Sequence, residues 1–78
     1  MSVAKKKIVY IMYVTNETLG YHPELLGVYK KSSYQKAYNR IADIAERHGL
    51  KVETGEGNIA IQVKAAKGIW WVERHECQ

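Results

Sequence analysis

The chain is poor in cysteine and proline and contains no phenylalanine. Its single cysteine, Cys77, excludes an internal disulfide and a cysteine-based zinc site within one chain. The single proline, Pro23, together with Asn16 and Gly20, breaks any regular pattern between residues 15 and 24 and predicts a loop there. Without phenylalanine the interior must be filled by other residues, so the six tyrosines and two tryptophans are candidates for the core.

Long hydrophobic runs and a strong charge of one sign are also absent. No apolar stretch approaches the length of a membrane span. The apolar run that follows the positively charged segment 1–7 is too short and too rich in tyrosine for a signal peptide, so we expect a cytoplasmic protein. The 12 basic and 8 acidic residues give a net charge of +4, which excludes a strongly acidic mimic of DNA. This balance fits contact with nucleic acid, contact with an acidic protein surface, or ordinary solubility.

Residues suited to catalysis or metal binding are few and scattered. The histidines lack the short spacing of a zinc motif: His22, His48 and His75. Residues 55–57, Gly-Glu-Gly, lack the Lys-Ser/Thr pair of a phosphate-binding loop. Glu73, His75 and Cys77 share one face of the last predicted strand, but a catalytic Cys-His pair needs converging side chains, and neighbours along a strand project in parallel. We therefore expect no enzymatic activity, no metal and no cofactor.

Hydrophobic periodicity predicts five strands and one helix. Strands are expected at residues 8–14, 25–30, 50–54, 59–63 and 69–76. The first and last of these are apolar on both faces, which is typical of central strands. Placing them side by side gives the strand order 2-1-5-4-3, with every neighbouring pair antiparallel. The sequence therefore predicts an α+β fold with element order β-β-α-β-β-β, in which one helix packs on one face of a five-stranded antiparallel sheet.

The helix has candidate caps at both ends. Ser32 is expected at the N-cap and Gln35 three residues later, which is the spacing of a capping box. Gly49 is expected just beyond the last turn, with Leu50 as its apolar partner. Since 78 residues bury one modest core, we expect residues 1–78 to form a single compact domain with a flexible basic N-terminus at 1–7.

The aromatic residues suggest a surface on the sheet. Trp70 and Trp71 point to opposite faces of the last strand, so one of them must lie on the face that the helix leaves open, alongside Tyr10 and Met12 or alongside Tyr13 and Ile11. The residues predicted for an open-face interface are Trp70, Trp71 and Tyr13. Such a patch usually marks an interface, and both homodimerisation and base stacking on a sheet platform fit it.

Basic residues gather where the second strand gives way to the helix. The residues predicted to bind a partner there are Lys30, Lys31, Lys36 and Arg40. Unpaired N–H groups at a helix start would also attract anions. A solvated rim without a partner is the alternative interpretation.

Three segments resemble small proteins encoded by phages and prophages. They are residues 8–11 (Ile-Val-Tyr-Ile), 26–33 (Leu-Gly-Val-Tyr-Lys-Lys-Ser-Ser) and 68–74 (Gly-Ile-Trp-Trp-Val-Glu-Arg). The resemblance is closest to a small class of anti-CRISPR proteins with the same element order, in which Lys-Ser before the helix and an aromatic C-terminal strand recur. The matching residues here are Lys31-Ser32 and Trp71-Val72 through Glu76-Cys77-Gln78. The longer helix and the insertion Arg74-His75 depart from that class.

The resemblance implies a non-enzymatic inhibitor that binds a CRISPR effector complex and blocks DNA engagement. Lys30, Lys31, Lys36 and Arg40 would then contact the effector, and a phage-encoded protein would act in the host cytoplasm. Two alternatives remain open. One is a nucleic-acid-binding module that uses an aromatic sheet platform, and the other is a homodimeric phage accessory protein.

Overall fold

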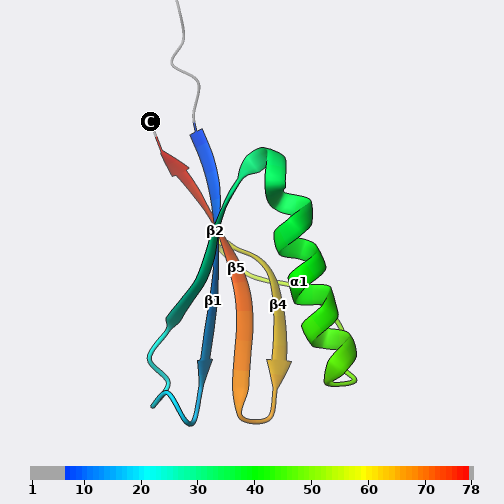
Figure 1. Ribbon diagram of the computed structural model, residues 1–78. Coiled ribbons are helices and arrows are strands. Elements are labelled where there is room, and N and C mark those ends of the chain that lie inside the picture. The colour runs from blue at the N-terminus through cyan, green and yellow to red at the C-terminus, as the bar shows by residue number, and fades with distance from the viewer. Residues whose placement is uncertain (1–6, 78) are drawn as a thin grey trace, which may run out of the picture.

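The protein folds as one antiparallel sheet with one helix on one side (Figure 1). The computed structural model describes residues 7–77 and, of Cys77, the backbone only. The elements in chain order are β1 (Lys7–Asn16), β2 (Glu24–Lys30), the short 3-10 helix η1 (Lys31–Ser33), α1 (Tyr34–Arg47), β3 (Glu53–Thr54), β4 (Ile59–Ala65) and β5 (Gly68–Cys77). The spatial order is β2-β1-β5-β4-β3, and each neighbouring pair is antiparallel. The predicted fold class, element order and strand order are therefore confirmed. The predicted flexible N-terminus at 1–7 lies outside the described residues, except for Lys7, which begins β1.

The two central strands are those that the sequence makes apolar on both faces. β1 and β5 pair over their whole length, from Lys7 opposite Cys77 to Asn16 opposite Gly68. A central strand is flanked by another strand on each side, so its side chains are less exposed to solvent than those of an edge strand. A run that is apolar on both faces is therefore favoured in the middle of a sheet. These strands therefore anchor the molecule.

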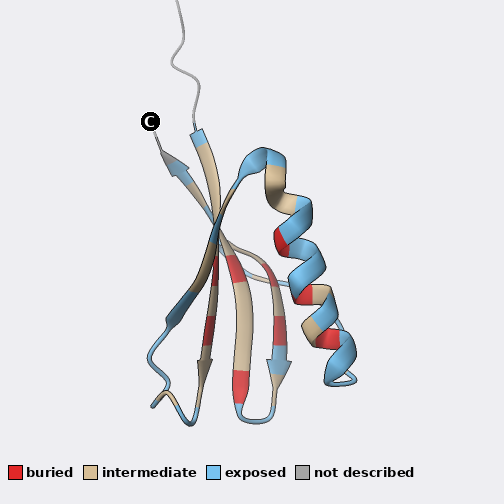
Figure 2. Cartoon of the chain, in the orientation of Figure 1, coloured by how far each residue is buried: buried red, intermediate tan, exposed pale blue. Residues whose placement is uncertain are grey.

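The core lies between the sheet and α1. Every second residue of a strand points to the same face, so Met12 of β1, Val63 of β4 and Val72 of β5 all reach the helix, and each is fully buried. From the helix side, Ala37, Ile41 and Ala45 meet them at intervals of four residues (Figure 2). Full burial of each large aliphatic side chain contributes about 1.5–3 kcal/mol. Most of the residues between these positions on α1 are exposed to water.

The start of the helix differs from the prediction. Ser32 is not the N-cap: η1 spans Lys31–Ser33 and α1 begins at Tyr34, with Ser33 at the cap position and no side-chain cap hydrogen bond. Gln35 makes no capping box either, because its Nε2 donates to Asn39 Oδ1 at 2.9 Å, one turn along the helix. Ser33 has φ −107° and ψ 12°, outside the extended region from which an N-cap hydroxyl reaches the first turn. The chain enters α1 through a tightened turn instead.

The end of the helix matches the prediction. Gly49 has φ +65°, a left-handed conformation that glycine adopts without strain. Leu50 N donates to Ala45 O at 2.7 Å, and Gly49 N donates to Glu46 O at 3.2 Å. These two bonds define a Schellman motif, which satisfies carbonyls at the last turn and turns the chain toward β3.

Both edges of the sheet are protected against pairing with another strand. β3 has only two residues. β2 carries a bulge at Leu26, where Met12 faces Gly27 and the next residue, Tyr13, faces Leu25. Arg40 of α1 reaches this edge, where its Nη1 donates to Leu26 O at 3.3 Å and to the Tyr29 hydroxyl at 2.6 Å. Short edges, bulges and covering charges all disfavour strand addition. Pairing of either edge with a further strand is therefore disfavoured.

Candidate functional site

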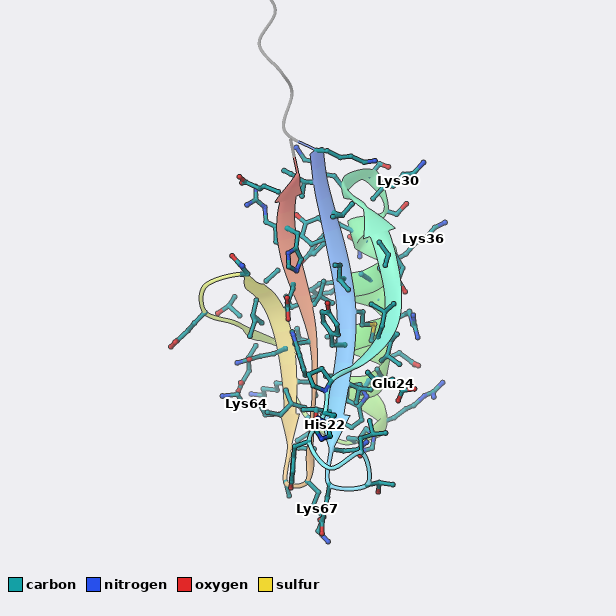
Figure 3. All side chains as sticks on the ribbon, turned by 90° about the vertical axis from the view of Figure 1, so that its left-hand side faces the viewer. His22, Glu24, Lys30, Lys36, Lys64 and Lys67 are labelled. Carbon is teal, nitrogen blue, oxygen red and sulfur yellow. The ribbon has the colours of Figure 1, made fainter. Side chains whose placement is uncertain are left out.

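One face of the sheet has no layer above it. α1 lies entirely on the other side, so the view in Figure 3 looks straight onto side chains of the strands. Strand register places three rows of residues on this face: Val9 between Lys30 and His75, Ile11 between Val28 and Glu73, and Tyr13 between Leu25 and Trp71. We call this surface the open face, made of Val9, Ile11, Tyr13, Leu25, Val28, Trp71, Glu73 and His75, with Lys30 at its border.

The open face combines an aromatic stack with exposed aliphatic side chains. The rings of Tyr13 and Trp71 stack with centroids 5.4 Å apart and an interplanar angle of 26°. Beside them, on β2, Leu25 is 56% exposed and Val28 is 60% exposed. The side chains of leucine and valine make no hydrogen bonds with water, and Leu25 lies in one row with the half-buried rings of Tyr13 and Trp71, with Val28 beside Ile11 in the next row. Contiguous exposed apolar surface usually marks a site of contact with another molecule.

A polar chain crosses the same face. Trp71 Nε1 donates to Glu73 Oε2 at 2.7 Å, and His75 Nε2 lies 2.9 Å from Glu73 Oε1. The Glu73 carboxylate thus contacts the residues two positions before and two positions after it, which share its face of β5, and it lies next to the aromatic stack. Within residues 7–76, no group of three or more His, Cys, Asp or Glu side chains is arranged to hold a metal ion. The structure shows Glu73 and His75 in contact, and the side chain of Cys77, the third residue of the predicted stripe, lies outside the described part of the chain.

Trp70 does not belong to the open face, which corrects the predicted set. It lies on the helix-covered side, where it packs against the core and its ring lies 5.0 Å from that of His48. Tyr10 is also on the covered side, with its ring centroid 4.5 Å from that of Tyr34. The tryptophan on the open face is therefore Trp71. Of the two predicted sets of neighbours for it, the one with Tyr13 and Ile11 is correct.

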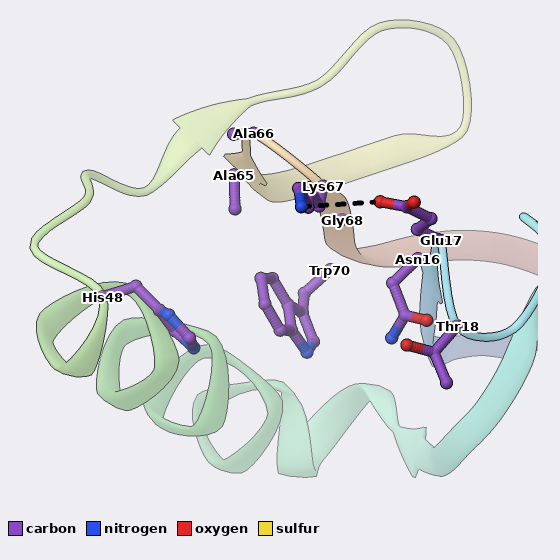
Figure 4. Close-up of a pocket in the computed structure, with 9 residues that line it drawn as sticks. All are labelled: Asn16, Glu17, Thr18, His48, Ala65, Ala66, Lys67, Gly68 and Trp70. Carbon is purple, nitrogen blue, oxygen red and sulfur yellow. Dashed lines mark ion pairs between the residues drawn. The ribbon is translucent and has the colours of Figure 1, made fainter.

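Trp70 and His48 form one wall of a groove at the end of the molecule opposite η1 (Figure 4). Asn16 and Thr18 lie across from them, while Lys67 closes the rim. Lys67 Nζ is 3.9 Å from Glu17 Oε2, and both side chains are largely exposed, so this ion pair contributes little stability. The groove offers an indole face, an amide, a hydroxyl and an ammonium group. Sequence reasoning missed it because the loop after β1 and the β4–β5 turn are brought together by strand pairing, with Asn16 opposite Gly68 and Glu17 N donating to Lys67 O at 3.1 Å.

The four basic residues predicted to bind a partner fall into two groups. Lys30, Lys31 and Lys36 are exposed and make no ion pair with another described residue; Lys30 and Lys36 project from one side of the molecule in Figure 3. Arg40 differs, because its guanidinium is engaged by the Tyr29 hydroxyl and the Leu26 carbonyl. Arg40 therefore stabilises the β2 edge, and only the lysines are free to meet a ligand.

The lysines surround a second groove, at the η1 end of the sheet. Its walls are formed by Lys7, Ile8, Lys30, Lys31 and Ser32. The lining is mostly apolar, contributed by Ile8 and by the alkyl stems of the lysines, whose ammonium groups reach into water. Two residues of this groove, Lys7 and Ile8, were not predicted as site residues, because the pairing of β1 with β2 is needed to place them beside Lys30.

Three tyrosines cluster where η1 meets the sheet. Tyr34 lies between Tyr10 and Tyr38, with ring centroids 4.5 and 6.4 Å away. Burial raises the pKa of the Tyr34 hydroxyl above its usual value, and the neighbouring Tyr10 and Tyr38 add to that shift. This cluster fixes the first turn of α1 and does not form part of the open face.

Comparison with known proteins gives no relative: no family model, curated protein or solved structure matches the chain. Among residues 7–77, no helix is long and apolar enough to cross a membrane. The open face and the two grooves therefore have to be interpreted from their own chemistry.

Proposed function

We propose that the protein is a non-catalytic binding protein whose open face contacts the apolar surface of another protein. The observation that carries this proposal is the exposure of Leu25 and Val28 beside the Tyr13–Trp71 stack, on a sheet face that α1 leaves uncovered. Burying these side chains against a partner would remove apolar surface from water at about 25 cal/mol per Å². The protected sheet edges leave this face as the favourable route to a partner.

The chemistry of the open face favours protein over nucleic acid. A base-stacking platform needs ring faces that are turned to solvent. Here Tyr13 and Trp71 turn their faces toward each other, with centroids 5.4 Å apart. The Glu73 carboxylate beside them would repel a phosphate backbone, whereas it can accept a hydrogen bond from a partner protein. A protein surface with an apolar centre and a donor opposite Glu73 fits this arrangement best.

A photo-crosslinking amino acid placed on the open face tests the proposal. At position 28 it replaces an exposed side chain in the middle of the face, and at position 46 it sits on the exposed side of α1 as a matched control. In the cells that encode the protein, we expect a discrete protein adduct from position 28 and none from position 46. An adduct between two copies of the chain would identify the partner as a second copy. Equal yields at the two positions, or a nucleic-acid adduct at position 28, would overturn the proposal.

The resemblance to anti-CRISPR proteins specifies a partner that can be tested directly. In that case the protein binds a CRISPR effector complex and blocks DNA engagement, with Lys30, Lys31, Lys36 and Arg40 in contact with it. The three lysines support this proposal by their exposure and lack of described ion pairs, whereas the engagement of Arg40 assigns it a weaker part. A pull-down with purified effector complexes should retain the protein and lose it with Lys30→Glu/Lys31→Glu. Absence of binding to every effector type would refute this partner and leave the open face to be explained by another protein.

A further inference from the structure

We propose that the groove at the η1 end of the sheet, ringed by lysines, binds the phosphate backbone of nucleic acid. This basic groove is formed by Lys7, Ile8, Lys30, Lys31 and Ser32, with Lys36 just beyond it on α1. Lys30 of this groove pairs with Val9 at the border of the open face, but the aromatic stack of that face occupies other residues of β1 and β5. Each surface can therefore be tested without the other.

The fold brings these residues together from three places in the chain. Lys7 and Ile8 begin β1, and Lys30 ends β2 opposite Val9. η1 starts at the next residue, Lys31, so the turn into the helix lies directly beside the start of β1. The three lysines of the groove therefore lie at one end of the sheet, although in the sequence Lys7 is separated from the other two by β1, the loop after it and most of β2.

Within residues 7–76, the lysines of the basic groove make no ion pair, a property that they share with Lys51 and Lys64 but not with three other cations. Arg47 lies 2.9 Å from Asp43 and Arg74 lies 2.8 Å from Glu76, and Lys67 approaches Glu17 at 3.9 Å. By contrast, Lys7, Lys30, Lys31 and Lys36 make no ion pair within residues 7–76. No acidic residue occupies the first turn of η1 or of α1, so nothing offsets the partial positive charge of the helix start. The result is a local excess of positive charge that an anion can neutralise.

The ligand chemistry follows from the other residues that line the groove, because lysine ammonium groups attract phosphate and carboxylate alike as point charges. The nearby arginine, Arg40, is already bound to the Tyr29 hydroxyl and the Leu26 carbonyl. Ser32 adds a hydroxyl that can donate to a phosphate oxygen, and Ile8 adds an apolar wall for a sugar. The sugar-phosphate backbone of a nucleic acid therefore fits this groove better than an acidic peptide does, and it would be bound without contacts to the bases.

Binding to phosphates by four lysines has a measurable salt dependence. Release of counterions from a duplex gives a slope of log K against log salt of about −0.9 per neutralised phosphate, and about −0.7 for a single strand. If Lys7, Lys30, Lys31 and Lys36 each neutralise one phosphate, the slope is about −3.6 for a duplex and about −2.8 for a single strand. Affinity should not depend on base sequence.

The test is fluorescence anisotropy with labelled 20-mer oligonucleotides, single-stranded and duplex, over a series of salt concentrations. Lys30→Glu/Lys31→Glu should weaken binding at least tenfold at low salt and should reduce the magnitude of the negative slope by about 2. The matched control, Lys51→Glu/Lys64→Glu, makes the same change in net charge at exposed lysines away from the groove and should weaken binding less than threefold. Circular dichroism verifies that each variant is folded.

Three outcomes would overturn the proposal. One is the absence of binding by the wild-type chain at low salt. Another is an equal loss of affinity in the two double variants, which would reduce the effect to net charge alone. The last is competition in which a poly-glutamate peptide of equal charge displaces the oligonucleotide more efficiently than unlabelled oligonucleotide does, which would assign the groove to an acidic protein.

Discussion

Trp71 stacks on Tyr13 across β5 and β1, with ring centroids 5.4 Å apart, on the face of the sheet that α1 leaves uncovered. The preceding residue, Trp70, packs against the core on the opposite face of the sheet. Two adjacent tryptophans thus have separate parts, because successive side chains of a strand alternate between faces. Trp70 packs on the core, and Trp71 lies on the uncovered face.

Substitution of each tryptophan should separate these parts. Trp70→Ala removes a ring that packs on the core and on His48, and it should lower the free energy of unfolding by about 3 kcal/mol or more. Trp71→Ala removes a half-buried ring, its stacking contact with Tyr13 and its hydrogen bond to Glu73, and it should cost about 1–2 kcal/mol. Urea denaturation followed by circular dichroism measures both. Equal losses, or a larger loss for Trp71→Ala, would contradict the assignment of the two faces.

Neither serine before the helix should matter much for stability. No side-chain cap hydrogen bond is made at the start of η1 or of α1, so Ser32→Ala and Ser33→Ala should each change the free energy of unfolding by no more than about 0.5 kcal/mol. A serine that caps a helix would cost about 1 kcal/mol on the same substitution. Thermal and urea unfolding of the two variants distinguish these values. A loss near 1 kcal/mol for Ser32→Ala would restore the capping box that the sequence suggests.

The last turn of the helix should be sensitive to its glycine. An alanine Cβ at position 49 would meet no atom within 4 Å, so any cost of Gly49→Ala comes from the backbone conformation at φ +65°. We expect a loss of about 1 kcal/mol in the free energy of unfolding. Gly49→Asn is the control, since asparagine tolerates the left-handed conformation better and should lose less. If both substitutions lower the free energy of unfolding by the same amount, backbone strain at position 49 is not the cause of the loss.

The tyrosine cluster predicts a loss of stability at alkaline pH. The pKa of Tyr34 is raised in the folded chain above its usual value of about 10, so the folded state keeps this proton at a pH where the unfolded state releases it. The resulting stabilisation is fully present below about pH 10 and is lost as pH rises through the folded-state pKa. Tyr34→Phe should lack this part of the decline. The measurement is the free energy of unfolding of both chains between pH 8 and pH 11, as values of about this range bracket the tyrosine pKa. Parallel curves would show that Tyr34 does not contribute.

The architecture was predictable because it follows from local patterns with few alternatives. Residues 8–14 and the start of the last strand are apolar on both faces, which placed β1 and β5 in the centre, and chain connectivity then left one antiparallel order. Gly49 was predictable because its left-handed position follows a helix stripe. The same alternation placed Trp70 and Trp71 on opposite faces, but only the packed structure shows which of them the helix covers.

Long-range contacts decided what the sequence could not. Two serines precede the helix, and local propensity favours Ser32 as the cap, yet the packing of Tyr34 against Tyr10 accompanies a later start. Arg40 resembles its lysine neighbours in the sequence, but its partner, the Tyr29 hydroxyl, comes from another element. Lys7 and Ile8 join the basic groove through strand pairing alone. Charge and spacing along the chain carry no information on such contacts.

The central claim is that the open face is the contact surface for a protein partner. The most direct measurement is the dissociation constant of the crosslinked partner, purified, for the wild-type chain and for two variants. Val28→Asp puts a charge on an exposed side chain of the open face, and Glu46→Ala alters the exposed side of α1. We predict that Val28→Asp raises the dissociation constant at least tenfold, since a charge would be buried against an apolar surface, and that Glu46→Ala leaves it within twofold. An unchanged dissociation constant for a folded Val28→Asp chain would contradict the claim.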